Sequence, residues 1–408
     1  MDKNNLKILI IGTGSLLNYG CEAIVQGSYY ILKKYIPNCE IYLASDDFEY
    51  DRKILPRDII LVKYKKRFTL YRVIKGVLRR FLHIGQGSYV HLDCNIGKKF
   101  DIVLSSGGDN YCEAPNQTIY LFLRELMEIG HRTAQKGNQY TLWGASVGPF
   151  KNKNNELSVI ENLQEATRIF VREELSYKYL SQFKQLNNKL VLVADPAFAM
   201  QALDYDLDKD PNAIYVGINL SLLAFSYTDG NMSDYIRCLI SQLNFLLLNN
   251  PKIRLVFIPH VQQTGMQDDM ELLLPLYEGI TDKKKVVLID KGLGARKTKG
   301  LIRQLDLLIA SRMHCCVGGI SVGTPTLFVT YSNKGKGMSF YAYGHHNYEI
   351  ECSVIGEDEF ITKVNLMLDS KEKIKNYLLL QNDRFMRDAC KAGNLLVQEN
   401  DTSSDCVR

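Results

Sequence analysis

Short apolar runs alternate with helical patterns along most of this chain of 408 residues. The runs are rich in Ile, Leu and Val, and several of them end in glycine turns. Such runs are typical of strands buried on both faces of a parallel sheet, with helices as the connections. The alternation therefore predicts a doubly wound α/β fold. The expected strands are 6–11, 40–44, 59–62, 101–105, 140–144, 168–171, 190–193, 213–219, 254–259, 286–289, 307–309 and 326–330, and a helix is expected at 22–35.

A polar, proline-containing stretch at 206–212 interrupts this alternation, which then restarts. We therefore expect two Rossmann-like halves that face a cleft. Ligands in such sheets bind beyond the carboxyl ends of the strands, so functional residues are expected in the loops there. The predicted divisions are an N-terminal Rossmann-like domain at 1–205, a C-terminal Rossmann-like domain at 213–345, C-terminal helices at 346–398 and a frayed tail at 399–408.

The composition favours an ordinary globular protein and disfavours several other classes. Ten cysteines are scattered without the paired spacing of a zinc site, which predicts reduced thiols in the cytoplasm and neither a disulfide framework nor a metal. The formal charge of +5 is too small to support a nucleic-acid partner. The apolar run at 8–11 is too short for the core of a secretion signal or for a membrane span, and no later run reaches the length of about 20 residues that a spanning helix needs. Secretion and membrane spanning are therefore both disfavoured.

One segment, 63–84, has an unusual charge pattern: basic residues crowd its first part and no acidic residue interrupts them. Drawn as a helix, the part 70–84 has apolar residues on one half of the wheel and Arg72, Lys75, Arg79 and Arg80 on the other. This pattern suits an anionic membrane surface, and so predicts a peripheral position on the inner face of the cell membrane. The alternative is a core-packing helix with a solvated basic face.

The stretch 307–319 reads as a strand, a polar turn and the first turn of a helix. Arg312 and His314 lie where that helix should begin, and a helix start stabilises an anion through its unpaired N–H groups and positive dipole end. Arg312 adds a planar fork for phosphate or carboxylate, and His314 adds a proton donor near neutral pH. The pattern predicts an anion pocket. The alternative is that His314 is a packed, hydrogen-bonded core histidine and that Arg312 forms an interdomain salt bridge.

Weaker signals accompany this stretch. Lys334 lies in a glycine-flanked loop after the strand 326–330 and could serve the anion site as a point charge. Arg172 follows another strand and offers a second carboxylate fork, whereas Asp195 is interpreted as a turn-forming cap. The turn at 12–14 lacks the third glycine of the dinucleotide fingerprint, so no nicotinamide or flavin cofactor is predicted.

Taken in order, these short motifs resemble the polysaccharide pyruvyl transferase family, and the resemblance spans residues 7–340. Individually the motifs are common, and it is their order and spacing that make the signal specific. The matching pieces are Gly12-Thr13-Gly14, Asn18-Tyr19-Gly20-Cys21-Glu22-Ala23, Ser106-Gly107-Gly108-Asp109, Ser146-Val147-Gly148-Pro149, Val171-Arg172-Glu173, Asp195-Pro196, Ile258-Pro259-His260, Ser311-Arg312-Met313-His314 and Tyr331-Ser332-Asn333-Lys334.

The resemblance implies two Rossmann-like domains similar to the glycosyltransferase B fold, with phosphoenolpyruvate as co-substrate and neither a cofactor nor a metal ion. The acceptor it implies is a sugar of a surface polysaccharide, or of its lipid-linked precursor, that receives a pyruvate ketal across two hydroxyls. It places Arg172, Arg312, Met313 and His314 at the donor, on the C-terminal domain's side, with Lys334 as a further cation. In this interpretation His314 is the general acid.

On the acceptor side the sequence departs from the family pattern at one position. The family usually has an acidic residue directly before the glutamate, and here that residue is Cys21. Glu22 remains the second catalytic candidate, and Asn18, Asp109 and His260 are further acceptor-side candidates.

Two other functions compete with this interpretation. A nucleotide-sugar-dependent glycosyltransferase could use the same helix start for a diphosphate. A non-catalytic carbohydrate-binding protein of the same fold is the other, and Cys21 is the feature that points to it.

Overall fold

The computed structural model describes residues 5–63, 93–113, 121–228, 230–262, 268–289, 292–354 and 358–402. The predicted basic segment 63–84 lies outside these residues except for Lys63. Of the predicted tail, residues 399–402 belong to the last helix, and residues from 403 onward lie outside the described ranges. The chain forms two compact units, and neither is one continuous stretch. The first unit comprises 1–15, 36–171 and 176–191, and the second comprises 16–35, 172–175 and 192–408.

The first unit is built on a sheet with the strand order β3-β2-β1-β4-β5-β6-β7. Its central strand β1 pairs in parallel with β2 and β4, so that Ile8 lies opposite Ile41 and Ile102. The strands are β1 (Lys7–Ile11), β2 (Glu40–Ser45), β3 (Ile59–Lys63), β4 (Ile102–Ser105), β5 (Gln139–Ala145), β6 (Arg168–Val171) and β7 (Leu190–Leu192). The helices are α2 (Phe48–Ile54), α4 (Leu121–Gln135), α5 (Lys153–Gln164) and α6 (Glu174–Leu180), with 3-10 turns η1 (Ile96–Lys99) and η2 (Lys184–Leu186).

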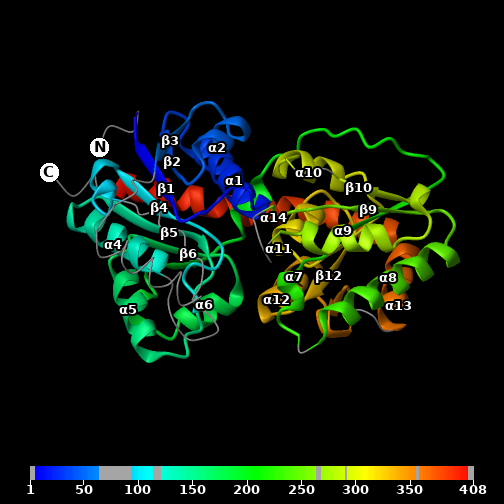
Figure 1. Cartoon of the computed structure of the whole chain (residues 1–408). Coiled ribbons are helices and arrows are strands. Elements are labelled where there is room, and N and C mark those ends of the chain that lie inside the picture. Colours follow the sequence, from blue (N-terminus) through cyan, green and yellow to red (C-terminus); the bar gives the residue numbers. More distant parts are fainter. Residues whose placement is uncertain are drawn as a thin grey trace, which may run out of the picture. The chain divides into compact units, whose positions relative to one another are not determined.

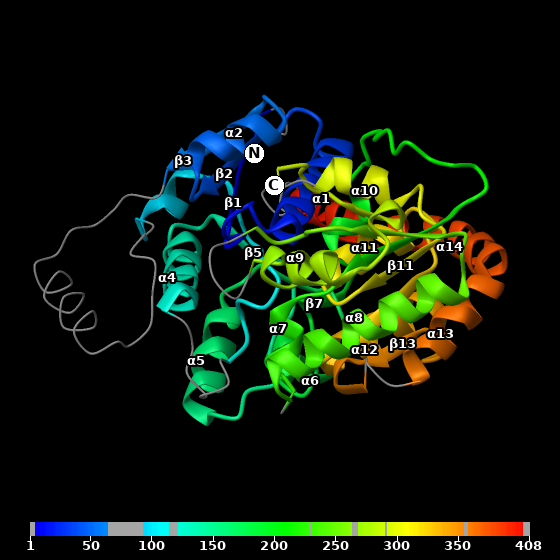
Figure 2. The same cartoon turned by 45° about the vertical axis from the view of Figure 1, so that its right-hand side comes forward.

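The second unit has a parallel sheet of order β10-β9-β8-β11-β12-β13, and helices cover both of its faces (Figures 1 and 2). The strands are β8 (Ile214–Asn219), β9 (Ile253–Phe257), β10 (Val286–Leu288), β11 (Leu307–Ala310), β12 (Thr326–Thr330) and β13 (Glu349–Glu351). The helices are α1 (Tyr19–Tyr35), α7 (Leu222–Phe225), α8 (Met232–Asn249), α9 (Met270–Gly279), α10 (Ala295–Ile302), α11 (Met313–Ile320), α12 (Asn333–Tyr343), α13 (Asp358–Asp369) and α14 (Lys371–Thr402), with 3-10 turns η3 (Pro196–Ala199), η4 (Lys283–Lys285) and η5 (Cys352–Val354).

The predicted fold class, two Rossmann-like α/β domains, is confirmed, and each predicted strand is found close to its expected bounds. The sequence did not indicate β13, because this short edge strand reads Glu-Ile-Glu and only Ile350 in it is buried. The first helix begins at Tyr19 and not at Glu22, because Asn18 caps it. The side chain of Asn18 accepts the N–H of Gly20 at 2.9 Å, and its carbonyl accepts the N–H of Glu22.

Helix α1 comes from the start of the chain but packs inside the second unit. Its main neighbour is the 3-10 turn η3, and the two backbones approach very closely at Gly27. A Cβ atom on Gly27 would lie 1.8 Å from the carbonyl oxygen of Pro196, so a side chain at this position is excluded. This packing brings the first turn of α1 close to residues that lie more than a hundred positions later in the chain.

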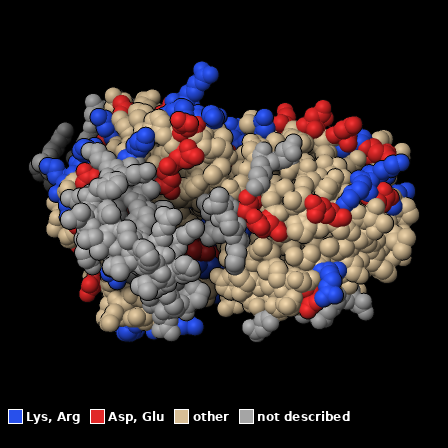
Figure 3. Space-filling view, viewed as in Figure 1, with Lys and Arg blue, Asp and Glu red and all other residues tan. Residues whose placement is uncertain are grey.

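No helix in the described ranges has both the length and the apolar character that crossing a membrane requires. On the face of the second unit seen in Figure 3, basic and acidic side chains are interspersed around areas without charge.

Helix α10 contains a buried lysine whose ionisation should be visible in the stability of the protein. The ammonium group of Lys299 donates to the carbonyl oxygen of Met200 at 2.6 Å, and only 4% of the residue is exposed. Burial lowers the pKa of Lys299 to about 7. Above this pH the folded chain has released the proton, whereas the unfolded chain keeps it until its ordinary pKa of about 10.4. The free energy of unfolding should therefore rise with pH across this window.

We expect Lys299→Met to remove most of this rise, which urea unfolding at a series of pH values between 6.5 and 9.5 would measure. The matched control is Lys297→Met, because Lys297 is an exposed lysine of the same helix. An equal pH slope in the wild type and in Lys299→Met would show that Lys299 does not titrate in this range.

Candidate functional site

The predicted anion pocket lies at the start of α11. Strand β11 is buried throughout, and α11 is buried from Cys315 to its end, so packing anchors the whole strand–turn–helix unit. Arg312 is the N-cap residue, with an extended backbone, and the half-buried Met313 and His314 form the first turn. The first N–H groups of a helix have no partner within the helix, so this end is suited to an anion.

Arg312 is held by a buried carboxylate. Its Nε and Nη2 lie 2.9 and 2.8 Å from Oδ1 of Asp269, which is fully buried. The other oxygen, Oδ2, accepts the backbone N–H groups of His260 and Val261 at 2.9 and 3.0 Å and the side-chain amide of Asn219 at 3.1 Å. Burial raises the pKa of Asp269, and the charge of Arg312 opposes this rise only in part. The guanidinium is therefore fixed in place by a carboxylate that is itself fully bonded.

His314 takes part in a second buried cluster. Its Nε2 lies 3.2 Å from Oδ2 of Asp195 and 3.3 Å from Nη1 of Arg172. Arg172 also donates to the same oxygen of Asp195 at 2.7 Å. Burial raises the pKa of Asp195, but the charges of His314 and Arg172 outweigh it and hold this pKa well below its usual range. Asp195 is thus an ionised carboxylate that binds both donor-site candidates.

Two residues of this cluster, Arg172 and Asp195, lie after the ends of neighbouring strands. Arg172 directly follows β6, Asp195 follows β7, and these two strands are adjacent in the sheet order. Asp195 also caps η3, since its Oδ1 accepts the N–H of Ala197 at 2.8 Å, which confirms its interpretation as a turn-forming cap. Its contacts with the arginine and the histidine were not predicted.

Three of the acceptor-side candidates also belong to the second unit. Asn18 is the cap of α1, and the carboxylate of Glu22 accepts the N–H of Ala295 at 2.7 Å, at the start of α10. His260 is buried beside Tyr19, with their rings edge to face at 5.6 Å. Burial first, and then the positive charges of His314 and Arg312, lower the pKa of His260 to about 3. Its imidazole is therefore neutral at physiological pH.

The remaining candidates are distributed over both units. Met313 is the first residue of α11. Lys334 lies in the first turn of α12, after β12, and β12 pairs in parallel with β11, so Lys334 and Arg312 follow the carboxyl ends of neighbouring strands. Asp109 belongs to the first unit, where it is exposed in the turn after β4.

Sequence reasoning missed the two carboxylates that hold the arginines. Asp195 carried a signal, since Asp195-Pro196 was one of the motifs of the family resemblance. Asp269 carried no such signal, because the sequence around it does not indicate a contact with Arg312, which lies 43 positions later in the chain. Within the described ranges, no group of three or more His, Cys, Asp and Glu side chains is arranged to hold a metal ion.

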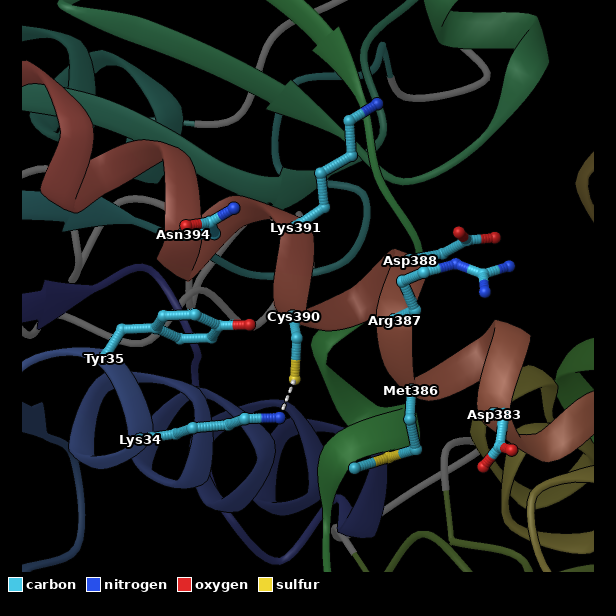
Figure 4. A pocket seen from close by; sticks show the side chains of 9 residues that line it. All are labelled: Lys34, Tyr35, Asp383, Met386, Arg387, Asp388, Cys390, Lys391 and Asn394. Atoms are coloured by element: carbon cyan, nitrogen blue, oxygen red, sulfur yellow. Dashed lines mark hydrogen bonds between the residues drawn. The ribbon is translucent and has the colours of Figure 1, made fainter.

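A separate hollow of about 600 Å³ lies between α1 and α14 (Figure 4). Its lining includes the cations Lys34, Arg387 and Lys391 and the carboxylate of Asp383. Lys34 points toward Cys390, with 3.9 Å between Nζ and Sγ. None of the predicted site residues lines this hollow.

Comparisons with known proteins extend over most of the chain. The family model "Polysaccharide pyruvyl transferase" matches residues 18–333, a range that contains the start of α1, Arg172, Asp195 and the start of α11. The amylovoran biosynthesis protein AmsJ of Erwinia amylovora is 21% identical over 398 residues, which cover 91% of this chain and 94% of AmsJ.

Solved structures share the fold at low identity. HepE of Anabaena, in complex with UDP and glucose, is 13% identical with a TM-score of 0.57, and the match covers 98% of this chain and 100% of HepE. The UDP-GlcNAc 2-epimerase of Neisseria meningitidis, bound to UDP-GlcNAc, is 10% identical with a TM-score of 0.58, covering 97% of this chain and 100% of the epimerase. These likenesses agree with a two-Rossmann-domain architecture similar to the glycosyltransferase B fold.

Proposed function

Because the chain belongs to the polysaccharide pyruvyl transferase family, we propose that it moves the enolpyruvyl unit of phosphoenolpyruvate onto two hydroxyls of a sugar. The product would be a pyruvate ketal, with release of phosphate. The proposed acceptor is a sugar of a surface polysaccharide or of its lipid-linked precursor, which the likeness to an amylovoran biosynthesis protein supports. The main support for this donor is the grouping of Arg172, Arg312 and His314 within one unit, at and beside a helix start.

The donor carries a phosphate and a carboxylate, and the site offers matched groups for both. Arg312, at the start of α11, and Arg172 are each held by a buried carboxylate, so their forks are oriented before a ligand arrives. Donors that are already oriented stabilise developing charge without a reorganisation cost during the reaction. We propose that Lys334 adds a third positive charge.

We propose His314 as the general acid. Its proton would pass to the methylene carbon of phosphoenolpyruvate, and the C=C electron pair would form the new C–H bond. The resulting oxocarbenium-like centre would be attacked by one sugar hydroxyl. Loss of phosphate and attack by the second hydroxyl would then close the ketal, and each hydroxyl would release one proton. Asp195, ionised and bonded to Nε2, would stabilise the charged imidazole.

For the acceptor we propose Glu22 as the residue that orients or deprotonates a hydroxyl, with Asn18 and His260 of the same unit as further contacts. The bond from Ala295 fixes the carboxylate of Glu22 in the first turn of α1. A lipid-linked acceptor at the inner face of the cell membrane is proposed from the basic residues of 63–84 alone.

A second candidate is a nucleotide-sugar-dependent glycosyltransferase. The specific observation in its favour is that structural neighbours of the same architecture were solved with UDP or a UDP-sugar. The start of α11 would serve a diphosphate as well as a phosphate.

Thermal stabilisation distinguishes the two donors. A ligand present at about 100 times its dissociation constant adds roughly 2.7 kcal/mol to the stability of the protein. We expect phosphoenolpyruvate to stabilise the wild type, and Arg312→Lys to lose most of this effect, since lysine keeps a charge beside Asp269 but lacks the fork. Stabilisation by UDP-sugars alone would replace the proposed donor with the second candidate.

A further inference from the structure

The first turn of α1 lies directly against the imidazole ring of His314. A Cβ atom built on Gly20 would lie 2.5 Å from Nδ1 of His314 and 2.9 Å from its Cγ. The next nearest atom is Oδ1 of Asn18 at 3.0 Å. Distances under 3 Å between a Cβ atom and another heavy atom require something to move, so the ring can occupy this position only because Gly20 has no side chain.

The backbone itself does not require glycine at this position. Gly20 is helical and is not among the glycines with a positive φ. Alanine is favoured over glycine in a helix by up to about 1 kcal/mol. The glycine therefore provides space for the ring at the expense of local helix stability.

The other side of the ring is occupied by charged groups. Nε2 lies within 3.3 Å of both Asp195 and Arg172. From the residues that the structure describes, no hydrogen bond reaches Nδ1. The two ring nitrogens thus have different environments, with Nε2 bonded to a buried carboxylate and Nδ1 facing a glycine.

We propose that Gly20 is a positioning residue: because it has no side chain, the ring of His314, the general acid of the proposed reaction, can lie with Nε2 at Asp195 and Arg172. This inference rests on the proposed function.

Gly20 and Gly27 differ in what a side chain at each position would meet. A Cβ atom on Gly27 would meet the backbone of Pro196, which cannot move away without disturbing η3. At Gly20 the obstacle is a half-buried side chain, which can turn. We therefore expect Gly20→Ala to fold and to displace the imidazole.

The test compares Gly20→Ala with the wild type and with Gly337→Ala. Gly337 is an exposed helical glycine of α12 with open space where a Cβ atom would go, so its variant reports the effect of the exchange alone. For Gly20→Ala we expect a folded protein with a cooperative melting transition, stabilisation by phosphoenolpyruvate within about threefold in affinity, and a kcat lowered by about 10²-fold, the size expected when a reacting group is misplaced by about 1 Å. Gly337→Ala should keep the wild-type kcat.

The protonation of the ring is measured separately by NMR of ¹⁵N-labelled histidines, with His314 assigned from a His314→Gln variant. In the wild type we expect the neutral ring to carry its proton on Nε2, and in Gly20→Ala we expect both nitrogen shifts to change. A wild-type ring protonated on Nδ1, or a Gly20→Ala enzyme with wild-type kcat and unchanged shifts, would overturn the inference. Absence of any response of the wild type to phosphoenolpyruvate would instead reject the proposed donor, and the NMR result would still show how the ring is seated.

Discussion

Replacement of His314 by glutamine should lower kcat by about 10² to 10⁴-fold, the usual contribution of a general acid. Glutamine fills a similar volume and keeps hydrogen bonds to Asp195 and Arg172 possible, but it cannot release a proton near neutral pH. Donor binding should change little, because the arginines and the helix start remain. The measurement is phosphate release from phosphoenolpyruvate with an oligosaccharide acceptor, together with the thermal shift that the donor causes.

The matched control is His346→Gln. His346 is a surface histidine with more than half of its side chain exposed, and it pairs with Glu349. Its loss should leave kcat and donor binding unchanged. If His314→Gln turned over at the wild-type rate while still binding donor, another group would have to supply the proton.

Among the substitutions proposed for this protein, removal of the Asp269 carboxylate is expected to lower the free energy of unfolding most. Asp269→Ala leaves Arg312 as a buried charge without its carboxylate, and it also removes the acceptor of the N–H groups of His260 and Val261. Breaking a buried ion pair from one side typically costs about 3–5 kcal/mol. Urea unfolding should show a loss of this size, and the melting temperature should fall with it.

Two further variants separate the loss of this ion pair from other causes. Asp269→Leu combined with Arg312→Met replaces the whole pair by apolar groups, and should recover much of the stability that Asp269→Ala loses. Asp234→Ala breaks an ion pair with Arg237 on the surface of the same unit, where both side chains are largely exposed, and should change stability by no more than about 0.5 kcal/mol. If Asp269→Ala were as stable as the wild type, the carboxylate would not be what holds Arg312.

The strands and the helix start that forms the donor site could be predicted from the sequence, because both are local features. An apolar run such as β1 is stable only when both of its faces are buried, as they are inside a parallel sheet. A similar run that is followed by a polar turn and small residues predicts the strand–turn–helix unit that carries Arg312 and His314. The same reasoning failed for β13, since a strand at the edge of a sheet can be short and charged. It also missed the start of α1, which one capping side chain sets.

The partners of the site residues were decided by tertiary structure alone. Arg172 and His314 are 142 positions apart, and the carboxylate between them becomes a common partner only when η3 and α11 pack together. Likewise, Gly20 meets His314 because α1 leaves the first sheet and packs within the second unit. The sequence by itself determined which stretches are strands and helices, and where a helix start offers an anion site, because periodicity and capping act over a few residues. Which distant side chain completes an ion pair depends on how those elements pack, and no local pattern contains that information.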